Sequence, residues 1–566
     1  MTGLNPSIGL SALAAAQRGL EVVGHNMANA ATPGYARQRV ELAEARPESR
    51  QVGGQVGTGV RVLSVRRVVD RFAVERLRDA TASAGYDAAL ASRLGELERL
   101  VADPSEAGLT ASAGRFFAAA AELAARPDDS STRLVFAAEA DLLTERLRAV
   151  AGGLDGFVAD VHAEVEAGVE EVRGLLERVA AVDAAIKEAR VAGQQPNDLL
   201  DERDRLVSDL AERIGAQASE QTDGSLTVTA GGKLLLSSGR ARPLGVEQAA
   251  DGSSRIAVAG EPLSPGGRLG GLSAAQEEAG GLRADLDEFA RGLMLAANGV
   301  HATGVPLGGP YTSLQSTVPV QDVNGSGSPL DDPLVAAGLP FPPGASEIVV
   351  NVTDFATGSI TTTRVGFDPS RQGLGDLAAA LDGVAGLRAS AGADGILRLD
   401  ADPGMGFDFA PRAGGSADAG GVLAGLGVGA LFAGTGAADV RVADAVAADP
   451  SALAAGLSAG AGDGRNAARL AELQGQPLEA LQGRSPQESV ARMLGRVGAA
   501  ARRARALSEG SELARGSLER AREEVSGVSV EEEVGAMIQY QRSFQAAARY
   551  LQVLHDLAGE LMQMVG

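Results

Sequence analysis

Ser458 is the residue whose surroundings most resemble a catalytic motif. Gly456-Leu457-Ser458-Ala459-Gly460 fits the G-x-S-x-G pattern of a nucleophile elbow, in which a tight strand-to-helix turn exposes a serine hydroxyl. A chain with 75 glycines contains such a match roughly once by chance, and no strand is expected before Ser458. We therefore interpret the motif as a loop. A secreted serine hydrolase, which would require a reactive Ser458, is the remote alternative.

A second candidate is an ion-binding loop that begins at Asp322. The run Asp322-Val323-Asn324-Gly325-Ser326-Gly327 starts like a calcium loop, but its twelfth position is Pro333, where an EF-hand needs a bidentate glutamate. An EF-hand is excluded, and a looser ion site stays open. The four histidines, at positions 25, 162, 301 and 555, are too far apart to share one helix face. We expect no metal and no cofactor, and we expect His301 to be a structural hydrogen-bonding residue.

A third candidate is the carboxylate-rich run Asn197-Asp198-Leu199-Leu200-Asp201-Glu202-Arg203-Asp204. Four carboxylates could bind a metal or transfer protons. On a helix, however, this spacing disperses them around the axis, and Arg203 and Arg205 lie between them. We predict a capped, salt-linked helix surface. Gly232-Lys233 is followed by leucine and lacks a glycine five residues earlier, so it is no P-loop, and we predict no catalytic residue.

Composition narrows the classes of partner. With 566 residues the chain has room for three or four domains. It carries 51 basic and 73 acidic residues, and its net charge of −22 argues against nucleic acid or anionic membrane as a partner. The absence of cysteine excludes disulfides and thiol chemistry. We expect neither a Sec signal peptide nor a membrane span, since no apolar run approaches 18 residues. Taken alone, these features would indicate a cytoplasmic protein.

The chain is organised around a long amphipathic helix expected from Val528 to Gly566. Ser529 can cap its start, and the acidic residues 531–533 suit the positive end of a helix. Its apolar stripe recurs every three, four or seven residues, which is typical of a helix that lies along another helix. The stripe consists of Val530, Val534, Met537, Phe544, Ala548, Leu551, Leu554, Leu561 and Met564.

The expected partner is a helix near the other end of the chain. Asn5 and Pro6 can start it, it runs to about Ala31, and Thr32-Pro33-Gly34 must end it. Small residues interrupt its apolar stripe, so the pair buries little area, and at ~25 cal/mol per Å² this barely offsets the cost of ordering the chain. We therefore predict a pair that is loose in the monomer and ordered in an assembly. The large residues of the stripe are Leu10, Leu13, Leu20 and Met27.

The fold class is expected to be mainly α with a β-rich insert. Helical periodicity covers residues 71–214 and predicts a bundle of long helices, one of which carries an apolar stripe of near-heptad spacing from Phe157 to Ile186. Residues 225–238 alternate and turn at Gly231-Gly232, which predicts a β-hairpin. Further helices are expected at about 274–302 and 485–525. Between them, strands at 348–352, 360–365 and 396–399 and a helix at 374–387 predict an inserted α+β domain. The predicted division is 1–70, 71–305 (with a β region at about 215–270), 306–436, 437–526 and 527–566.

Several segments resemble bacterial flagellar proteins. Leu10 to Leu42, LSALAAAQRGLEVVGHNMANAATPGYARQRVEL, resembles the N-terminal signature of flagellar rod, hook and hook-associated proteins, in which a small-residue helix ends in an Asn-rich turn followed by Gly-Tyr or Gly-Phe. Tyr35-x-Arg37-Gln38 is the form typical of the FlgK family of hook-associated proteins. The run 197–204 resembles the NDLLDxRD segment of that family, and GVSVEEEVGAMIQYQRSFQAAARYLQ, residues 527–552, resembles the C-terminal signature of the wider group.

The resemblance implies a non-enzymatic subunit of the flagellum at the hook–filament junction, outside the cell. It implies export through the flagellar type III apparatus, which places the chain only transiently in the cytoplasm. The implied partners are further copies of the chain in a ring, the hook protein, the next junction protein and a cytoplasmic chaperone at the C-terminal helix. A hook or distal-rod protein is the alternative. The residues expected at the assembly interface are Leu10, Leu13, Leu20, Met27, Tyr35, Val530, Val534, Met537, Phe544, Leu551, Leu554 and Leu561.

Overall fold

The computed structural model describes residues 6–46, 48–50, 54–101, 108–221, 224–412 and 417–565. Within these ranges the fold is mainly helical with several small sheets, as the sequence predicted. No helix in the described ranges combines the length and the apolar content that crossing a membrane requires. The chain divides into two compact units. The first comprises residues 1–93, 160–276 and 502–566, and the second comprises residues 94–159 and 277–501.

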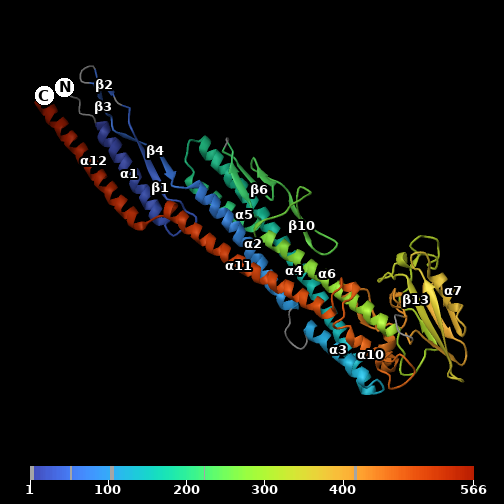
Figure 1. The fold of residues 1–566 in the computed structure, drawn as a ribbon. Coiled ribbons are helices and arrows are strands. Elements are labelled where there is room, and N and C mark those ends of the chain that lie inside the picture. The colour runs from blue at the N-terminus through green and yellow to red at the C-terminus, as the bar shows by residue number, and fades with distance from the viewer. Residues whose placement is uncertain are drawn as a thin grey trace. The chain divides into compact units, whose positions relative to one another are not determined.

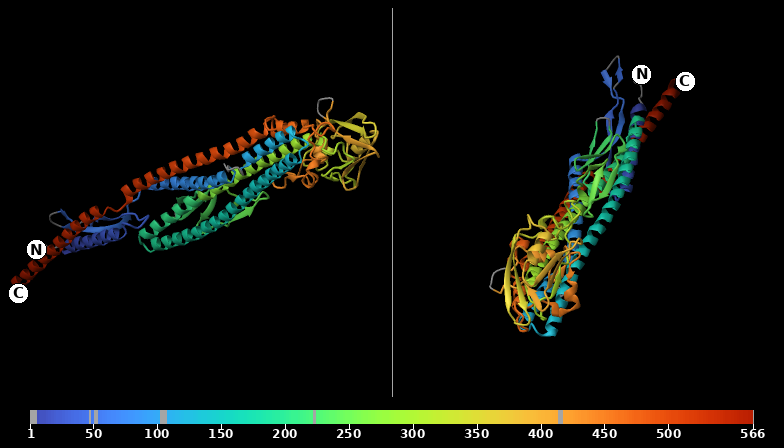
Figure 2. Two further views of the ribbon diagram at one scale, coloured as in Figure 1. Left: turned by 90° about the horizontal axis from the view of Figure 1, so that it is seen from below. Right: turned by 90° about the vertical axis from the view of Figure 1, so that its right-hand side faces the viewer.

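In the first unit the two ends of the chain lie side by side. α1 (Pro6–Ala28) runs along α12 (Val530–Val565), and the views of Figures 1 and 2 agree on this pairing. Next to α1, β1 (Gln38–Glu44) pairs antiparallel with β4 (Val60–Arg67). The predicted pairing of the two terminal helices is therefore present. The short hairpin between β1 and β4 is formed by β2 (Glu48–Arg50) and β3 (Gly54–Val56).

Long helices make up most of the rest of this unit. The buried stripe of α4 follows the near-heptad spacing predicted from the sequence, from Phe157 through Val161, Val165 and Val172 to Ile186. The helices that contribute to the unit, wholly or in part, are α2 (Arg71–Val101), α4 (Ser130–Val191), α5 (Asn197–Ile214), α6 (Gly267–Ala302) and α11 (Pro486–Ser526).

Two small antiparallel sheets follow α5. The predicted hairpin at Gly231-Gly232 is confirmed, because β6 pairs with β7 on either side of it, and both glycines have positive φ, 51° and 74°. The first sheet has the order β5-β6-β7-β8 and the second the order β11-β10-β9. Their strands are β5 (Gln217–Glu220), β6 (Leu226–Ala230), β7 (Lys233–Ser237), β8 (Arg240–Ala241), β9 (Leu244–Gln248), β10 (Ser254–Val258) and β11 (Glu261–Pro262).

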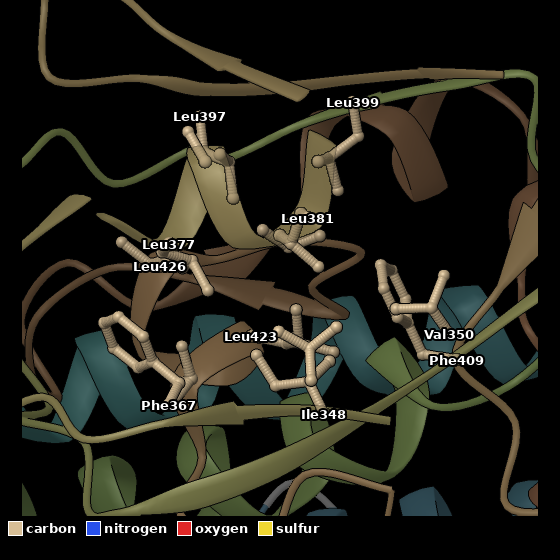
Figure 3. Packing of buried hydrophobic residues seen from close by; sticks show 14 of the residues in the cluster. Ile348, Val350, Phe367, Leu377, Leu381, Leu397, Leu399, Phe409, Leu423 and Leu426 are labelled. Atoms are coloured by element: carbon tan, nitrogen blue, oxygen red, sulfur yellow. The ribbon is translucent and has the colours of Figure 1, made fainter. Parts of the chain in front are cut away.

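The second unit contains the inserted α+β region. Two three-stranded sheets, β14-β13-β17 and β12-β16-β15, enclose a core that α7 (Leu374–Asp382) and α8 (Val422–Leu426) complete. Figure 3 shows side chains from both sheets and from both helices converging on this core. The strands are β12 (Ser313–Gln315), β13 (Ser346–Asp354), β14 (Ile360–Phe367), β15 (Leu387–Ala391), β16 (Leu397–Ala401) and β17 (Met405–Asp408).

Helices and short turns form the remainder of the second unit. The phenylalanine rings of α3 and α4 cluster with Phe432, with centroids 5.0 to 5.7 Å apart. These elements are α3 (Leu109–Ala125), β18 (Phe432–Ala433), β19 (Arg441–Val442), α9 (Asp444–Ala448), α10 (Arg465–Glu472) and the 3₁₀ turns η1 (Leu334–Ala336), η2 (Pro450–Ala452) and η3 (Glu479–Leu481).

Some predicted boundaries were wrong. The helix predicted at 374–387 ends at Asp382, because the chain turns at Gly383 and Gly386 and enters the strand β15. α1 ends at Ala28 and not at Ala31, since Asn29 to Thr32 already form turns. α6 begins at Gly267, earlier than predicted. The five-part domain division stays a prediction.

Candidate functional site

Small residues line the face of α1 that lies against α12. Gly9 lies against Leu551 and Tyr550, and Gly19 lies against the ring of Tyr540. A methyl group on either glycine would overlap these side chains, so only glycine permits this approach. The buried residues of α1 are Gly9, Ala15, Ala16, Gly19, Val22, Val23 and Asn26.

Most of the twelve residues predicted at the assembly interface remain partly exposed. Leu10 is 57% exposed and Val530 is 49% exposed. The side chain of Leu561 falls outside what the structure describes. The buried residues of α1 are thus its glycines, alanines, valines and Asn26 named above, and not the leucines that the apolar stripe suggested. Half-buried positions are Leu13, Leu20, Met27, Tyr35, Val534, Met537, Phe544, Leu551 and Leu554. Their contact with other subunits stays a prediction.

Asn26, at the end of α1, lies at the centre of a polar junction. Its amide nitrogen donates to the carbonyl of Gln38 at 2.9 Å and to Oε2 of Glu533 at 3.0 Å. Its amide oxygen accepts from the backbone N–H of Gln38 at 2.9 Å and from the hydroxyl of Tyr35 at 2.8 Å. Asn26 is 1% exposed, and these four bonds satisfy its hydrogen-bonding capacity. This side chain therefore fixes the turn after α1 relative to the start of α12.

Arg37 ties the same turn to the first turn of α12. Its Nε donates to Glu533 at 2.6 Å, and its terminal nitrogen donates to Glu532 at 2.6 Å. Glu533 is buried, whereas the side chain of Glu532 is 63% exposed. The backbone N–H of Arg37 donates to the carbonyl of Ser526 at the end of α11. Ser529 accepts from the N–H of Glu532, which confirms it as the predicted helix cap.

Gln38 connects the turn to the start of α5. Its side-chain nitrogen donates to Asp198 at 3.1 Å, and its side-chain oxygen accepts from Asn197 at 3.1 Å. Asn197 also donates to the carbonyl of Val65 in β4 at 2.8 Å. The Nε2 of His25 lies 3.4 Å from Asp198. A groove of about 750 Å³ opens beside these residues, between α1, β4 and the turn that precedes α5.

Asp201 extends the network toward α2. One of its oxygens accepts from the backbone N–H of Ala36 at 3.2 Å and the other from Arg67 at 2.6 Å. Arg67 also donates to Asp204, which accepts from Arg78 of α2 as well. The run 197–204 is salt-linked as predicted, but the prediction of a surface was wrong. Asn197, Asp201 and Arg203 are buried because the turn after α1 and the Arg203–Asp183 ion pair cover them.

Burial and the surrounding carboxylates set the protonation of the junction. Burial raises the pKa of the Tyr35 phenol, and the negative charges of Asp198, Asp201 and Glu533 raise it further. The phenol therefore keeps its proton and can donate to Asn26. Burial also raises the pKa of Asp201, against the lowering effect of its hydrogen bond with Arg67. What this arrangement does is mechanical, since it fixes α1, α5, α11 and α12 relative to one another.

The candidate chemical motifs are structural in the folded chain. The hydroxyl of Ser458 donates to Asp463 at 2.7 Å and accepts a hydrogen bond from Arg465 at 3.4 Å. The carboxylate of Asp322 accepts the backbone N–H groups of 325, 326 and 327, which closes the loop on itself. No group of three or more metal-ligating side chains occurs among the residues whose placement is described.

His301 has the structural role that we expected. Its Nδ1 lies 2.7 Å from the carbonyl of Gly429, and its Nε2 accepts from the N–H of Ala454 at 3.0 Å. Burial and the positive charge of Arg133 lower its pKa, the Gly429 hydrogen bond opposes them, and the resulting pKa is about 4. The ring is therefore neutral at pH 7 and connects two loops to α6.

Comparison with known proteins gives three matches to family models. The model described as "Flagellar hook-associated protein FlgK helical domain" matches residues 94–313. The model described as "Flagella basal body rod protein" matches residues 7–35, and "Flagellar basal body rod FlgEFG protein C-terminal" matches residues 520–564.

Individual relatives of the chain are named flagellar hook-associated proteins. The chain is 30% identical to "Flagellar hook-associated protein 1" of Salmonella typhimurium over 277 residues, which are 46% of this chain and 50% of that protein. It is 30% identical to the protein of the same name from Bacillus subtilis over 219 residues, 38% of this chain and 43% of that protein. The chain thus spans about half the length of the curated relatives it matches. Over the matched segments the chain is similar to flagellar hook-associated proteins of the FlgK type.

A solved structure extends the likeness of the fold. It is titled "The structure of the flagellar hook junction protein FlgK from Burkholderia pseudomallei" and covers 80% of this chain and all of the other, at 18% identity and a TM-score of 0.50. The segments matched by the two rod-protein models cover nearly all of α1 and α12, and the helical FlgK segment contains α5. Residues of all three matched segments meet at the polar junction.

Sequence reasoning found the segments of the junction but missed its central residues. From the sequence alone, Asn26 and Glu533 resemble ordinary polar residues on two helices, and Asn197 resembles a helix-capping residue. The sequence did offer one signal, which is a polar residue placed among apolar residues on the same helix face. Asn26 follows Val22 and Val23 on the buried side of α1, where an unpaired amide would be costly.

Proposed function

We propose that this chain is a structural subunit of the bacterial flagellum at the junction between hook and filament, where copies of it form a ring. The observation that carries the proposal is the polar junction. It joins the paired chain ends, which resemble axial flagellar proteins, to the helical domain specific to the FlgK family.

The surface of the terminal pair supports assembly with further copies. α12 exposes large apolar side chains along its length, with Val553 55% exposed, Leu557 42% and Met562 74%. Only Glu533 and Ala547 are buried among the side chains of α12 that the structure describes. Apolar residues recurring on the outside of a helix pair mark a surface that a partner covers. In our proposal neighbouring subunits cover it and thereby make the pair rigid.

The remaining partners and the route of export belong to the same proposal. The chain leaves the cell through the flagellar type III apparatus, and a cytoplasmic chaperone holds α12 before export. In the assembled flagellum it contacts the hook protein on one side and the next junction protein on the other. The absence of cysteine suits a chain that passes unfolded between redox compartments.

Deletion of the chain in its host tests the proposal. The expected result is cells with hooks of normal length, without filaments, and with filament protein released into the medium. Re-expression of the natural chain should restore the filaments. A chain lacking both α1 and α12 should fail to restore them. Filaments on the deletion strain would overturn the proposal, and filaments restored by the doubly truncated chain would overturn the role of the terminal helices.

The hook or distal-rod alternative is not favoured, because the helical domain at 94–313 matches a FlgK model and the NDLLDxRD helix lies at the junction. The hydrolase alternative is not favoured either. The hydroxyl of Ser458 donates a hydrogen bond to the carboxylate of Asp463, which also pairs with Arg465. The Arg465 pairing lowers the pKa of Asp463, so this carboxylate is a poor base for activating a serine.

A further inference from the structure

The part of α11 in the first unit, residues 502–526, turns apolar residues toward solvent and polar residues toward the protein. On a wheel of 100° per residue, one arc of this helix gathers mostly apolar and small side chains, and all of them are exposed. Leu507 is 52% exposed, Leu513 75% and Val525 45%. The arc consists of Ala506, Leu507, Gly510, Leu513, Ala514, Ala521 and Val525, and the exposed polar residues Ser517 and Glu524 lie within it. With Arg503 among them, they form a stripe about 27 Å long from Leu507 to Val525, which we call the α11 outer face.

The opposite side of the same helix is polar and faces the protein. Ser508, Ser511, Arg515 and Arg522 are half-buried there, and Arg515, Glu519 and Arg522 line a cleft of 230 Å³ shared with α5 and α2. A surface helix normally turns its leucines inward and its charges outward. A helix that does the reverse has an outer face adapted to a second protein surface.

A complementary surface lies on α4 in the same unit. Its exposed arc alternates small residues with glutamates, and every one of them is exposed. Most of the small residues follow one edge of the arc, and the glutamates follow the other. Within the subunit Arg173 pairs with Glu170, and His162 lies 3.7 Å from Glu166. The glutamates are 166, 170, 177 and 188, and the small residues are Ala163, Ala167, Gly174, Ala181 and Ala184. Together they form what we call the α4 outer face.

We infer that the α11 outer face of one subunit docks against the α4 outer face of a second copy of this chain. The leucines of α11 lie against the alanines and the glycine of α4, and Arg502 and Arg503 lie at the end of the contact nearest Glu166. The inference rests on the proposed function, because it assigns the lateral contact of the proposed ring. A closed ring requires two different, mutually complementary faces on each subunit, and α11 and α4 supply them.

The level of the two faces along the unit agrees with this contact. Arg213 of α5 pairs with Glu171 of α4 at 3.0 Å, and Glu212 next to it interacts with Arg515 of α11. Residues 513–515 therefore lie at about the height of residue 171 within one subunit. In a ring without axial offset, Leu513 of one subunit meets the interval between Ala167 and Gly174 of its neighbour.

Cysteine cross-linking in the host tests this contact, and the chain offers a clean background because it contains no cysteine. Leu513→Cys and Gly174→Cys variants are expressed together in the deletion strain and oxidised on intact hooks. A disulfide-linked dimer is expected with the two variants together and with neither alone. A dimer from Leu513→Cys alone would mean that two α11 helices meet, and this would overturn the inference. Absence of any dimer from subunits that do support filaments would also overturn it.

Substitution of open glycines gives a second readout that does not depend on cross-linking. A Cβ at Gly174 or Gly510 would meet nothing within 4 Å in the single subunit, so Gly174→Leu and Gly510→Leu should leave folding intact. Both should abolish filaments. Gly280→Leu, at an equally open helical glycine outside both faces, should retain them. Filaments with both variants would overturn the inference. If re-expression of the natural chain itself failed to restore filaments, this would refute the proposed function and not the docking contact alone.

Discussion

The inserted α+β region and the terminal helix pair use opposite means to hold segments together. The insert brings large side chains such as Phe407, Phe409 and Leu381 into a core that excludes water completely. The α1–α12 seam brings Gly9 and Gly19 against aromatic and leucine side chains that stay partly exposed. Both regions have regular secondary structure, but only the first is enclosed on all sides.

This difference in burial indicates which of the two regions needs contacts with other subunits to become rigid. A buried phenylalanine or leucine contributes about 1.5–3 kcal/mol, whereas a buried glycine contributes almost no apolar area. Ordering a residue costs about 1–2 kcal/mol. The insert can meet that cost from its own contacts. The seam relies on the polar junction at one end and, in our account, on subunits that cover the rest.

The largest effect is expected in the insert. Phe409→Ala should lower the free energy of unfolding of this region by about 3–5 kcal/mol, because it leaves a cavity beside Phe407 in a closed core. Hydrogen exchange of the β13 amides would measure the change. Phe355→Ala, at a residue that is 52% exposed, is the control and should cost about 1 kcal/mol or less. Equal effects would mean that the core is not closed.

A pH effect should follow from His301 in the same unit. Its pKa is about 4 in the folded chain and about 6.5 when unfolded, so its contribution to stability is complete above pH 6.5. As the pH falls from 6.5 toward 4, only the unfolded state gains the proton, and about 3 kcal/mol should be lost. The difference between the natural chain and His301→Gln in denaturant titrations should carry this slope. Identical pH profiles would refute it.

At the polar junction, Glu533→Ala should cost about 2 kcal/mol, because it removes one of the two acceptors of the Asn26 amide and the buried carboxylate that pairs with Arg37. Exchange of the amides of residues 38–40 and 533–537 would report the loss. Glu532→Ala removes a carboxylate that is 63% exposed and should cost less than about 1 kcal/mol. If the two variants behaved alike, the junction would not be the fixed end of the seam.

The smallest effect on the free subunit is expected in the seam. Gly19→Ala inserts a methyl group against Tyr540, whereas Gly24→Ala inserts one into open space. Because the seam contributes little to the free subunit, both should change its unfolding free energy by less than about 1 kcal/mol. Only Gly19→Ala should prevent the restoration of filaments in the deletion strain. A large destabilisation of the free subunit by Gly19→Ala would contradict the account.

The sequence predicted the long elements because their periodicity is local. The stripe of α4, the hairpin at Gly231-Gly232 and the cap at Ser529 follow from neighbouring residues alone, and the structure confirms them. The strand β15 was missed because a five-residue strand after two glycines has too few residues to show a period.

The candidate site was less predictable, because its bonds join residues far apart in the chain. Asn26 and Glu533 are 507 positions apart, and Gln38 and Asp198 are 160 apart. No spacing rule connects them. The apolar stripes also misled, since large residues suggested the face of α1 that meets its partner, while the close approach of two helices selects glycine and alanine.

Hydrogen exchange of the free subunit at nanomolar concentration tests the central claim most directly. We expect the amides of the insert's β13 and α7 to be strongly protected, while those of residues 10–27 and 540–564 exchange rapidly and become protected only in assembled hooks. Equal protection of the terminal helices and the insert in the free subunit would contradict the claim that neighbouring subunits make the terminal pair rigid.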